Sequence, residues 1–128
     1  MRLLLDTHLW VWLATNPARL SAAARAVFAD HGNVLVFSVV SIWEVAIKAA
    51  LKRPDFDADP VLLLDYLRLG PFEELHLIAE HTLPITILPP VHKDPFDRIL
   101  IAQAMAEEIQ LVTADRKLPA YPGVIRKV

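Results

Sequence analysis

The chain has 128 residues, a formal net charge of −2 and no cysteine. A chain of this length can bury one core without help from disulfides or a structural metal, so we expect a single domain over residues 1–128. The lack of cysteine excludes disulfide frameworks, thiolate nucleophiles and cysteine-based zinc sites, and it makes a reducing, cytoplasmic compartment the default expectation.

Short apolar runs alternate with helical patterns along the chain. In chain order, the predicted elements are a strand over residues 3–6, a helix from the cap Ser21 to about Asp30, a strand over 34–38, a helix from Ser41 to about Lys52, a helix from Asp59-Pro60 to Gly70-Pro71, a helix from Asp94-Pro95 to about Glu108, and strands at 111–113 and 124–125. Prolines at 71, 84, 89 and 90 predict only short helices or turns between residues 70 and 93.

This alternation predicts the fold class. Nearly continuous, β-branched runs are typical of strands that are buried on both faces of a parallel sheet. Strands that alternate with helices form such sheets through right-handed crossovers. We therefore expect an α/β domain in which a small parallel sheet carries helices on both faces.

Acidic residues recur where the predicted strands end. Asp6 ends the first strand, Glu44 lies in the first turn of the helix after the second, and Asp115 follows the strand at 111–113. Ligands collect at the carboxyl edge of an open parallel sheet, so these three carboxylates are expected at one edge. Asp94 and Asp97 open a helix before that last strand, and they join the others only if the preceding loop returns to the same edge.

Carboxylates that are packed together repel one another, and a divalent cation removes the conflict. A set of oxygen ligands without cysteine or paired histidine favours Mg²⁺ or Mn²⁺ over zinc. Such an ion can activate water and stabilise the charge that develops in phosphodiester hydrolysis. The net charge alone gives no overall attraction to nucleic acid, so phosphate binding would need this ion or local cations.

Each acid also has a structural interpretation. Ser41 and Glu44 have the spacing of a capping box, and Glu44 pairs favourably with Lys48 at i,i+4. Asp94 before Pro95 is typical of a helix N-cap, which is the role we favour for it, and Asp97 complements the helix dipole. Asp115 could stabilise a turn. Asp6 is the hardest to explain structurally, because an unpaired acid at the end of a central strand is costly to bury.

Other polar residues lie close to these acids in the sequence. Thr7 and Thr113 can orient carboxylates or act as caps, and Arg98 and Arg116 can meet substrate phosphates or remain solvated. No histidine pair has metal-ligand spacing, so His8 and His92 are expected to have structural or surface roles. Three tryptophans, at 10, 12 and 43, are expected to pack in the core or at an interface rather than to stack on bases.

Four motifs resemble the PIN-domain family, and within it the VapC-like toxin ribonucleases of toxin-antitoxin pairs. In order along nearly the whole chain, the motifs are Leu4-Leu5-Asp6-Thr7-His8, Ser38 to Lys48 around Glu44, His92-Lys93-Asp94-Pro95-Phe96-Asp97-Arg98 followed by Ala102-Gln103-Ala104, and Leu111-Val112-Thr113-Ala114-Asp115. The third motif is the most specific of the four.

The resemblance implies endonucleolytic cleavage of RNA by a cleft of acids that holds Mg²⁺ or Mn²⁺. Asp6, Glu44, Asp97 and Asp115 would be its catalytic acids and metal ligands, with Asp94 as an additional acid. It also implies a cognate antitoxin that fills a hydrophobic groove, and a homodimer. The 55% hydrophobic content of the chain is compatible with such a partner.

Two other functions compete with this one. A receiver-like phosphoacceptor module shares a small α/β fold, but it needs paired acids after the first strand, where this chain has Asp6-Thr7-His8. An inactive PIN-like protein that only binds protein or RNA is less expected, because all four acids are present. We expect no targeting segment and no membrane span, since Asp6 and His8 interrupt the apolar run near the start of the chain.

Overall fold

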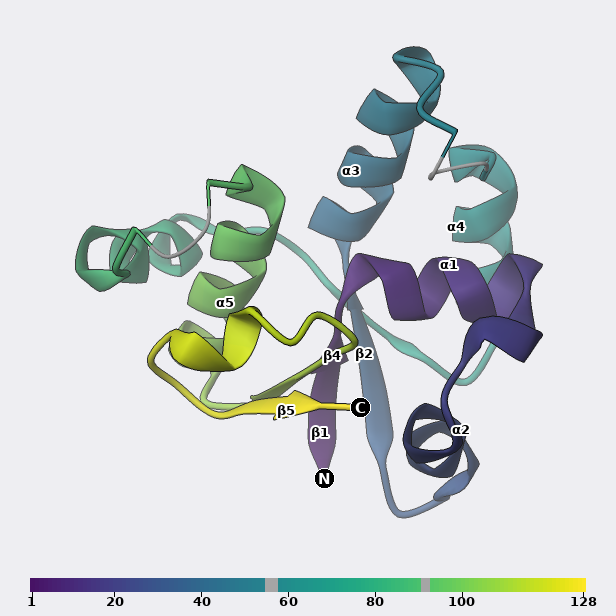
Figure 1. The fold of residues 1–128 in the computed structure, drawn as a ribbon, viewed down its shortest axis with the longest axis horizontal. Coiled ribbons are helices and arrows are strands. Elements are labelled where there is room, and N and C mark those ends of the chain that lie inside the picture. Colours follow the sequence, from purple (N-terminus) through teal and green to yellow (C-terminus); the bar gives the residue numbers. More distant parts are fainter. Residues whose placement is uncertain (55–57, 91–92) are drawn as a thin grey trace.

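A computed structural model describes residues 1–54, 58–90 and 93–128. Its centre is a five-stranded, fully parallel sheet with the strand order β3-β2-β1-β4-β5 (Figure 1). The strands are β1 (Arg2–Leu5), β2 (Val34–Ser38), β3 (Glu73–Leu75), β4 (Gln110–Thr113) and β5 (Ile125–Lys127). The predicted α/β class with a small parallel sheet is therefore confirmed, and β1 occupies the middle of that sheet.

In the described residues, five α-helices and three 3₁₀ helices connect the strands. They are α1 (Thr7–Thr15), η1 (Pro17–Arg19), α2 (Ala22–Ala29), α3 (Val39–Ala50), α4 (Pro60–Leu69), η2 (Ala79–Ile87), α5 (Pro95–Glu107) and η3 (Leu118–Ala120). The predicted caps Ser21, Asp59 and Asp94 are confirmed, because each side chain accepts hydrogen bonds from backbone N–H groups of the first turn. None of the helices in the described parts of the chain has the length and apolar character needed to cross a bilayer.

Alternate residues of the strands enter two hydrophobic cores, one on each face of the sheet. Leu3, Leu5 and Phe37 face a core that also contains Trp10 of α1 and side chains of α2 and α4. Leu4 faces the opposite core, which is covered mainly by α5, η2 and η3. Figure 1 shows the same division, with α1, α2 and α4 on one side of the sheet and α5 on the other. The predicted placement of helices on both faces is confirmed.

The tryptophans differ in their surroundings. Trp10 is fully buried and meets the rings of Phe28, Phe37 and Phe72 edge-on, as predicted for a core residue. Trp43 is half exposed on α3, where its ring packs edge-on against Phe96 of α5.

The start of α3 differs from the prediction. The helix begins at Val39, and its N-cap is Ser38, whose hydroxyl accepts a hydrogen bond from Val40 N. The predicted capping box of Ser41 and Glu44 is therefore wrong, because β2 passes directly into the helix and leaves no room for a later start. Glu44 consequently lies in the second turn of α3 rather than in the first.

The segment from residue 70 to residue 93 contains a strand that the sequence analysis missed. Glu73 and Glu74 give β3 little intrinsic strand propensity, and the strand is formed by edge pairing with β2. The predicted short helical structure is present as η2. Buried His81 joins η2 to α5, because its ring lies 3.1 Å from Glu107 Oε2 and 3.3 Å from Gln103 Nε2, and its Nδ1 accepts from Ile78 N.

Candidate active site

Asp6 lies at the carboxyl end of the central strand, where it is held from several directions. It is the N-cap of α1, and its Oδ1 accepts a hydrogen bond from Leu9 N at 3.1 Å. The other oxygen, Oδ2, accepts from the Thr113 hydroxyl and, at 3.2 Å, from Ala114 N. The parallel register pairs Leu5 with Val112, which places the end of β4 beside Asp6.

Burial dominates the electrostatics of Asp6. Its side chain is 4% exposed. Desolvation raises the pKa of Asp6, although the hydrogen bonds from Thr113, Leu9 and Ala114 act in the opposite direction. The chain therefore keeps a carboxyl group at the sheet edge at an energetic cost, in a fixed orientation.

Glu44 reaches the same region from α3. It is 2% exposed, and each of its oxygens has a partner. Thr7 Oγ1 donates to Glu44 Oε1 at 2.7 Å, and Lys48 Nζ donates to Glu44 Oε2 at 2.5 Å. The Thr7 hydroxyl also lies 2.9 Å from that of Ser41, so α1 and α3 are joined by side chains next to the acids.

Asp97 lies in the first turn of α5, close to the other acids. Burial raises its pKa to about 8, and the negative charges of four neighbouring carboxylates add to this rise: Asp94, Glu44, Asp6 and Asp115. The start of α5 thus lies at the carboxyl edge, which is the condition under which Asp94 and Asp97 were expected to join the other acids. The five acids form what we call the acidic cleft, in which burial first, and repulsion between the carboxylates second, favour the protonated form of Asp97.

Asp94 and Asp115 also stabilise the backbone around the cleft. Asp94 Oδ1 accepts from Phe96 N at 2.9 Å as the N-cap of α5. Asp115 Oδ1 accepts from Lys117 N at 2.8 Å, and its own N–H donates to Thr113 Oγ1. Thr113 therefore links the turn after β4 to Asp6.

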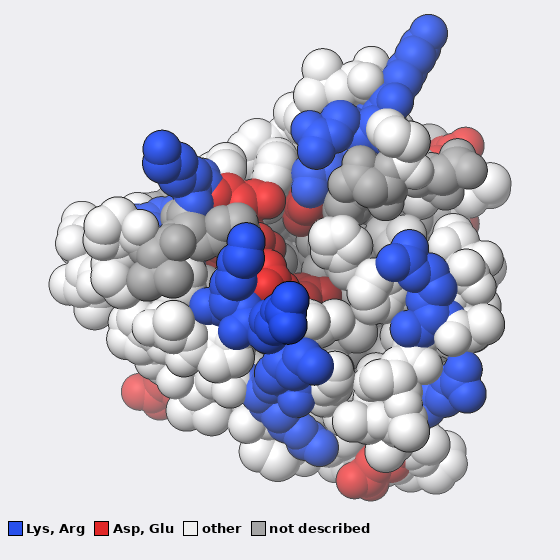
Figure 2. Space-filling model, in the orientation of Figure 1, with Lys and Arg blue, Asp and Glu red and all other residues white. Residues whose placement is uncertain are grey.

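The arginines named in the sequence analysis have different surroundings. Arg98 donates to the carbonyl oxygens of Pro89 and Leu88 at 2.9 and 3.5 Å, so it ties the loop after η2 to α5. Arg116 is exposed on the turn that follows Asp115. Figure 2 shows acidic side chains in a hollow, with lysine and arginine side chains around its border.

Two of the observations suit a divalent cation in the acidic cleft. The available donors are carboxylate and hydroxyl oxygens, and burial raises the pKa values of Asp6 and Asp97, with neighbouring carboxylates adding to the rise at Asp97. Within residues 1–54, 58–90 and 93–128, no three histidine or acidic side chains are already grouped so as to hold an ion. His92, which belongs to the third motif, lies outside the described residues.

Ser41 was not predicted as a neighbour of the acids, because it was assigned to the helix cap. The available signal was the i,i+3 spacing between Ser41 and Glu44, which places both side chains on one face of α3. The backbone N–H groups of Leu9 and Ala114, which donate to Asp6, were not predicted either. Backbone donors of this kind can be identified only when the conformation of the turns is known.

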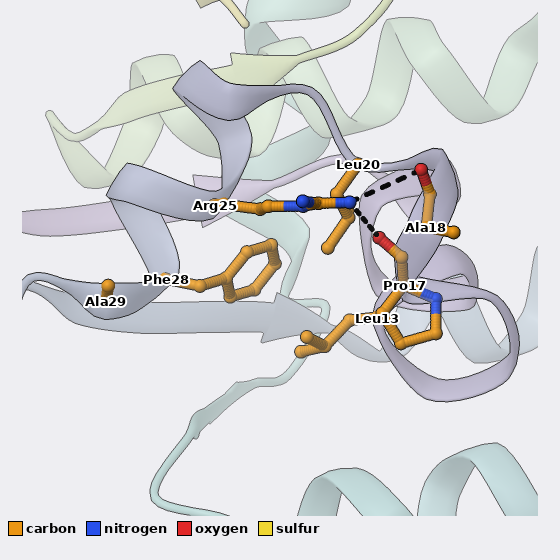
Figure 3. Close-up of a pocket in the computed structure, with 7 residues that line it drawn as sticks. All are labelled: Leu13, Pro17, Ala18, Leu20, Arg25, Phe28 and Ala29. Atoms are coloured by element: carbon orange, nitrogen blue, oxygen red, sulfur yellow. Dashed lines mark hydrogen bonds between the residues drawn. The ribbon is translucent and has the colours of Figure 1, made fainter.

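Two cavities lie apart from the acidic cleft. One of about 390 Å³ lies between α1 and α2, where the guanidinium of Arg25 contacts the carbonyl oxygens of Pro17 and Ala18 at 3.4 Å (Figure 3). Another, of about 490 Å³, adjoins the start of β1 and β4 and includes Met105. Neither is lined by a carboxylate of the cleft, so the geometry locates the candidate site at the carboxyl edge of the sheet.

Comparison with known proteins agrees with this architecture. Residues 3–124 match the model of the PIN domain. The chain is 32% identical over 129 residues to Ribonuclease VapC22 from Mycobacterium tuberculosis (strain ATCC 25618 / H37Rv), an alignment that covers 92% of this chain and 90% of the relative. These matches rule out the receiver-like module that the sequence analysis weighed.

Solved structures share the fold at low sequence identity. VapBC2 from Rickettsia felis, bound to a promoter DNA fragment, gives a TM-score of 0.73 at 19% identity and covers 99% of this chain and 98% of its own. DNA-bound VapBC from Salmonella typhimurium gives 0.70 at 14% identity with the same coverage. The sheet order, the sequence match and these neighbours agree, and the chain belongs to the PIN domain family, among members that are similar to VapC ribonucleases.

Proposed function

We propose that this chain is a metal-dependent endoribonuclease, acting as one nuclease domain over residues 1–128, and that it is the toxin of a toxin-antitoxin pair in the cytoplasm. Its relative is named a ribonuclease, and its structural neighbours are VapBC proteins. The observation that carries the proposal is that five acids lie together at the carboxyl edge of the sheet, where burial and the charges of Asp94, Glu44, Asp6 and Asp115 raise the pKa of Asp97 to about 8. Residues from both ends and the middle of the chain thus concentrate negative charge at one point.

Mg²⁺ or Mn²⁺ would be held principally by Asp6 and Asp97, with Glu44 and Asp115 completing the cleft. When bound, such an ion supplies Lewis acidity toward a phosphodiester and lowers the pKa of water. This assignment is supported by the oxygen-only donor set and by the mutual repulsion of the carboxylates.

The chain's own residues supply orientation. Thr113 and the N–H groups of Leu9 and Ala114 hold both oxygens of Asp6, so this carboxylate keeps its direction when its surroundings change. Thr7 orients Glu44 in the same way. Arg116, exposed beside Asp115, is placed where it can contact substrate phosphates.

The decisive test compares the native chain with the Asp97→Asn variant. Both proteins, freed of partner and of contaminating nucleases, are incubated with a mixed RNA pool and either Mg²⁺ or Mn²⁺. We expect metal-dependent cleavage by the native chain and its loss in the variant, with circular dichroism showing that both are folded. Metal binding without cleavage of any RNA by the native chain would favour the inactive, binding-only alternative.

We propose that a cognate antitoxin covers the outer face of α3 and α4. This face is strongly apolar for an exposed surface. Its exposed hydrophobic side chains are Trp43, Ile47, Leu51, Val61, Leu62, Tyr66 and Leu69. A groove of about 300 Å³ between the two helices, reaching from Val39 to Glu74, adds a place for an apolar side chain of the partner.

We also propose a homodimer, because exposed hydrophobic side chains also lie outside α3 and α4, among them Val34, Ile87 and Val124. Size-exclusion chromatography with light scattering, with and without the antitoxin, tests both assemblies. A chain that remains monomeric at high concentration contradicts the dimer, and a chain that elutes unchanged with its antitoxin contradicts the partner.

A further inference from the structure

Lys48 forms a largely buried ion pair inside the acidic cleft. Its Nζ lies 2.5 Å from Glu44 Oε2, and the side chains of Lys48 and Glu44 are only 14% and 2% exposed. An i,i+4 pair of this kind is common on the solvent face of a helix, where both heads remain hydrated. Here α3 turns the pair inward instead.

Burial of such a pair is costly in free energy. Two charges lose their hydration, and their attraction often only balances that loss, so apolar side chains of similar volume would stabilise the fold at least as well. Stability is therefore a weak reason for this pair. A better reason for the pair is that it holds the ammonium in a defined position and orientation.

The Lys48 ammonium lies where α3 meets the start of α5. It is 5.9 Å from the centre of the Phe96 ring, and Phe96 is the neighbour of Asp97 in the chain. The ring of Phe96 packs in turn against Trp43. The Lys48 ammonium therefore lies at the acidic cleft between the carboxylate of Glu44 and the ring of Phe96.

A phosphodiester that approaches several carboxylates needs positive charge besides that of a metal ion. Arg98 does not supply it at this position, because it binds the carbonyl oxygens of Leu88 and Pro89. Glu44, for its part, has both oxygens engaged by Thr7 and Lys48 and almost no exposed surface. Its geometry suits a residue that holds a cation better than a residue that binds an ion directly.

We propose that Lys48 contacts a phosphate of the RNA substrate, and that Glu44 is a positioning residue that holds the Lys48 ammonium rather than a ligand of the metal. This inference rests on the proposed nuclease function. The acids then have different roles. Asp6 and Asp97 bind the metal, whereas Glu44 positions Lys48 for contact with the substrate.

The test separates metal binding from RNA binding. Mn²⁺ affinity is measured by isothermal titration calorimetry for the native chain, Lys48→Met, Lys48→Arg, Glu44→Gln and the double variant Glu44→Gln/Lys48→Met. Affinity for a labelled mixed-sequence single-stranded RNA is measured by fluorescence anisotropy with the same substitutions in an Asp97→Asn background, which leaves the RNA uncut. Lys52→Met, which removes an exposed charge just beyond the same helix, is the matched control.

We expect Lys48→Met to weaken RNA binding roughly 10- to 100-fold, as the loss of a charge-assisted hydrogen bond requires. The dependence of its RNA affinity on salt concentration should decrease by the equivalent of about one phosphate contact. The same variant should bind Mn²⁺ at least as tightly as the native chain, because a positive charge beside the ion is gone. Lys48→Arg should recover part of the RNA affinity, and Lys52→Met should match the native chain in both assays.

Glu44→Gln should keep its Mn²⁺ affinity within about threefold of the native value, while its RNA affinity falls, since the ammonium is no longer held. The double variant removes both charges, so it guards against the unfolding that a single unpaired buried charge can cause. We expect it to fold, to bind Mn²⁺ and to bind RNA weakly.

Two results would overturn the proposal. One is a loss of Mn²⁺ affinity of tenfold or more in Glu44→Gln and in the double variant, which would make Glu44 a metal ligand. The other is unchanged RNA affinity in Lys48→Met. Other results would contradict the proposed nuclease function itself. In that case the native chain with Mn²⁺ would cut no RNA, or the Asp97→Asn variant would cut RNA as well as the native chain does.

Discussion

The hydroxyl of Thr113, at the end of β4, donates a hydrogen bond to the carboxylate of Asp6, at the end of β1. The two residues are 107 positions apart in the sequence and belong to neighbouring central strands. The orientation of the first acid of the cleft therefore depends on a residue near the other end of the chain.

Substitution of Thr113 by valine should reduce activity while the fold is kept. The change preserves shape but removes the donor to Asp6 and the acceptor for Asp115 N–H. We expect Mn²⁺ affinity and cleavage rate to fall roughly 10- to 100-fold, as is usual when a ligand loses the partner that orients it. Thr86→Val, which alters an exposed hydroxyl on η2, is the control. Equal Mn²⁺ affinity in both variants would contradict the orienting role.

The metal-free protein should lose stability as the pH rises. The pKa of Asp97 is raised from its ordinary value of 3.8 to about 8 in the folded chain. The stability associated with its proton is fully present below the unfolded value and is lost as the pH rises through the folded value. The loss should therefore extend from about pH 4 to about pH 8, and it can be followed as Tm in excess EDTA.

Asp97→Asn should remove the loss of stability with rising pH and should stabilise the metal-free protein at pH 8. We expect a gain of at least about 1 kcal/mol, or roughly 3–5 °C in Tm, because one of several repelling carboxylates is gone. Asp65→Asn, at an exposed position on α4, controls for the change in net charge. A Tm of Asp97→Asn that equals or falls below that of the native chain at pH 8 would show that charge repulsion is not the cause.

His81→Ala should destabilise the fold without touching the cleft. The substitution removes the contacts of the buried ring with Ile78 N, Gln103 and Glu107 and leaves a cavity between η2 and α5. We expect a loss of about 2–4 kcal/mol in urea unfolding. His76→Ala, whose side chain is 74% exposed, should change stability by less than about 0.5 kcal/mol. Similar losses for the two variants would contradict the buried role of His81.

Leu62→Glu should weaken antitoxin binding and leave cleavage unchanged. Leu62 is 67% exposed on α4, and glutamate preserves the helix while it places a charge on the apolar face. We expect at least a tenfold rise in Kd for the antitoxin, measured by titration calorimetry. Val124→Glu, at a 64% exposed position beside β5, is the matched control. An equal effect of both variants would place the partner elsewhere.

Most of the fold could be predicted from local patterns. The Asp-Pro pairs at 59–60 and 94–95 and the cap Ser21 mark helix starts with a known mechanism, and all three are confirmed. Strand β3 was missed because its Glu73-Glu74 sequence has no strand signal of its own, and only pairing with β2 forms it. The predicted start of α3 was wrong because Ser38 and Ser41 are equally good caps in isolation, and the position where β2 ends decides between them.

The candidate site was predictable in part. Parallel topology brings Asp6 and Asp115 to one edge, and that reasoning needs only the order of the elements. The approach of Asp97 depends on the path of the loop between η2 and α5, which no local pattern determines. The inward direction of the Glu44 and Lys48 pair depends on the packing of α3 against α5, so spacing alone could not separate a buried pair from a surface one.

The central position of β1 has a consequence for synthesis. This strand is synthesised well before one of its two neighbours, β4, which comes from residues 110–113. A nascent chain that has not reached β4 lacks Thr113 and Asp115 and has an open edge on its middle strand. Residues 110–115 must therefore be synthesised before the acidic cleft can form, so a nascent chain that ends before them lacks part of the group of acids that we propose to cleave RNA.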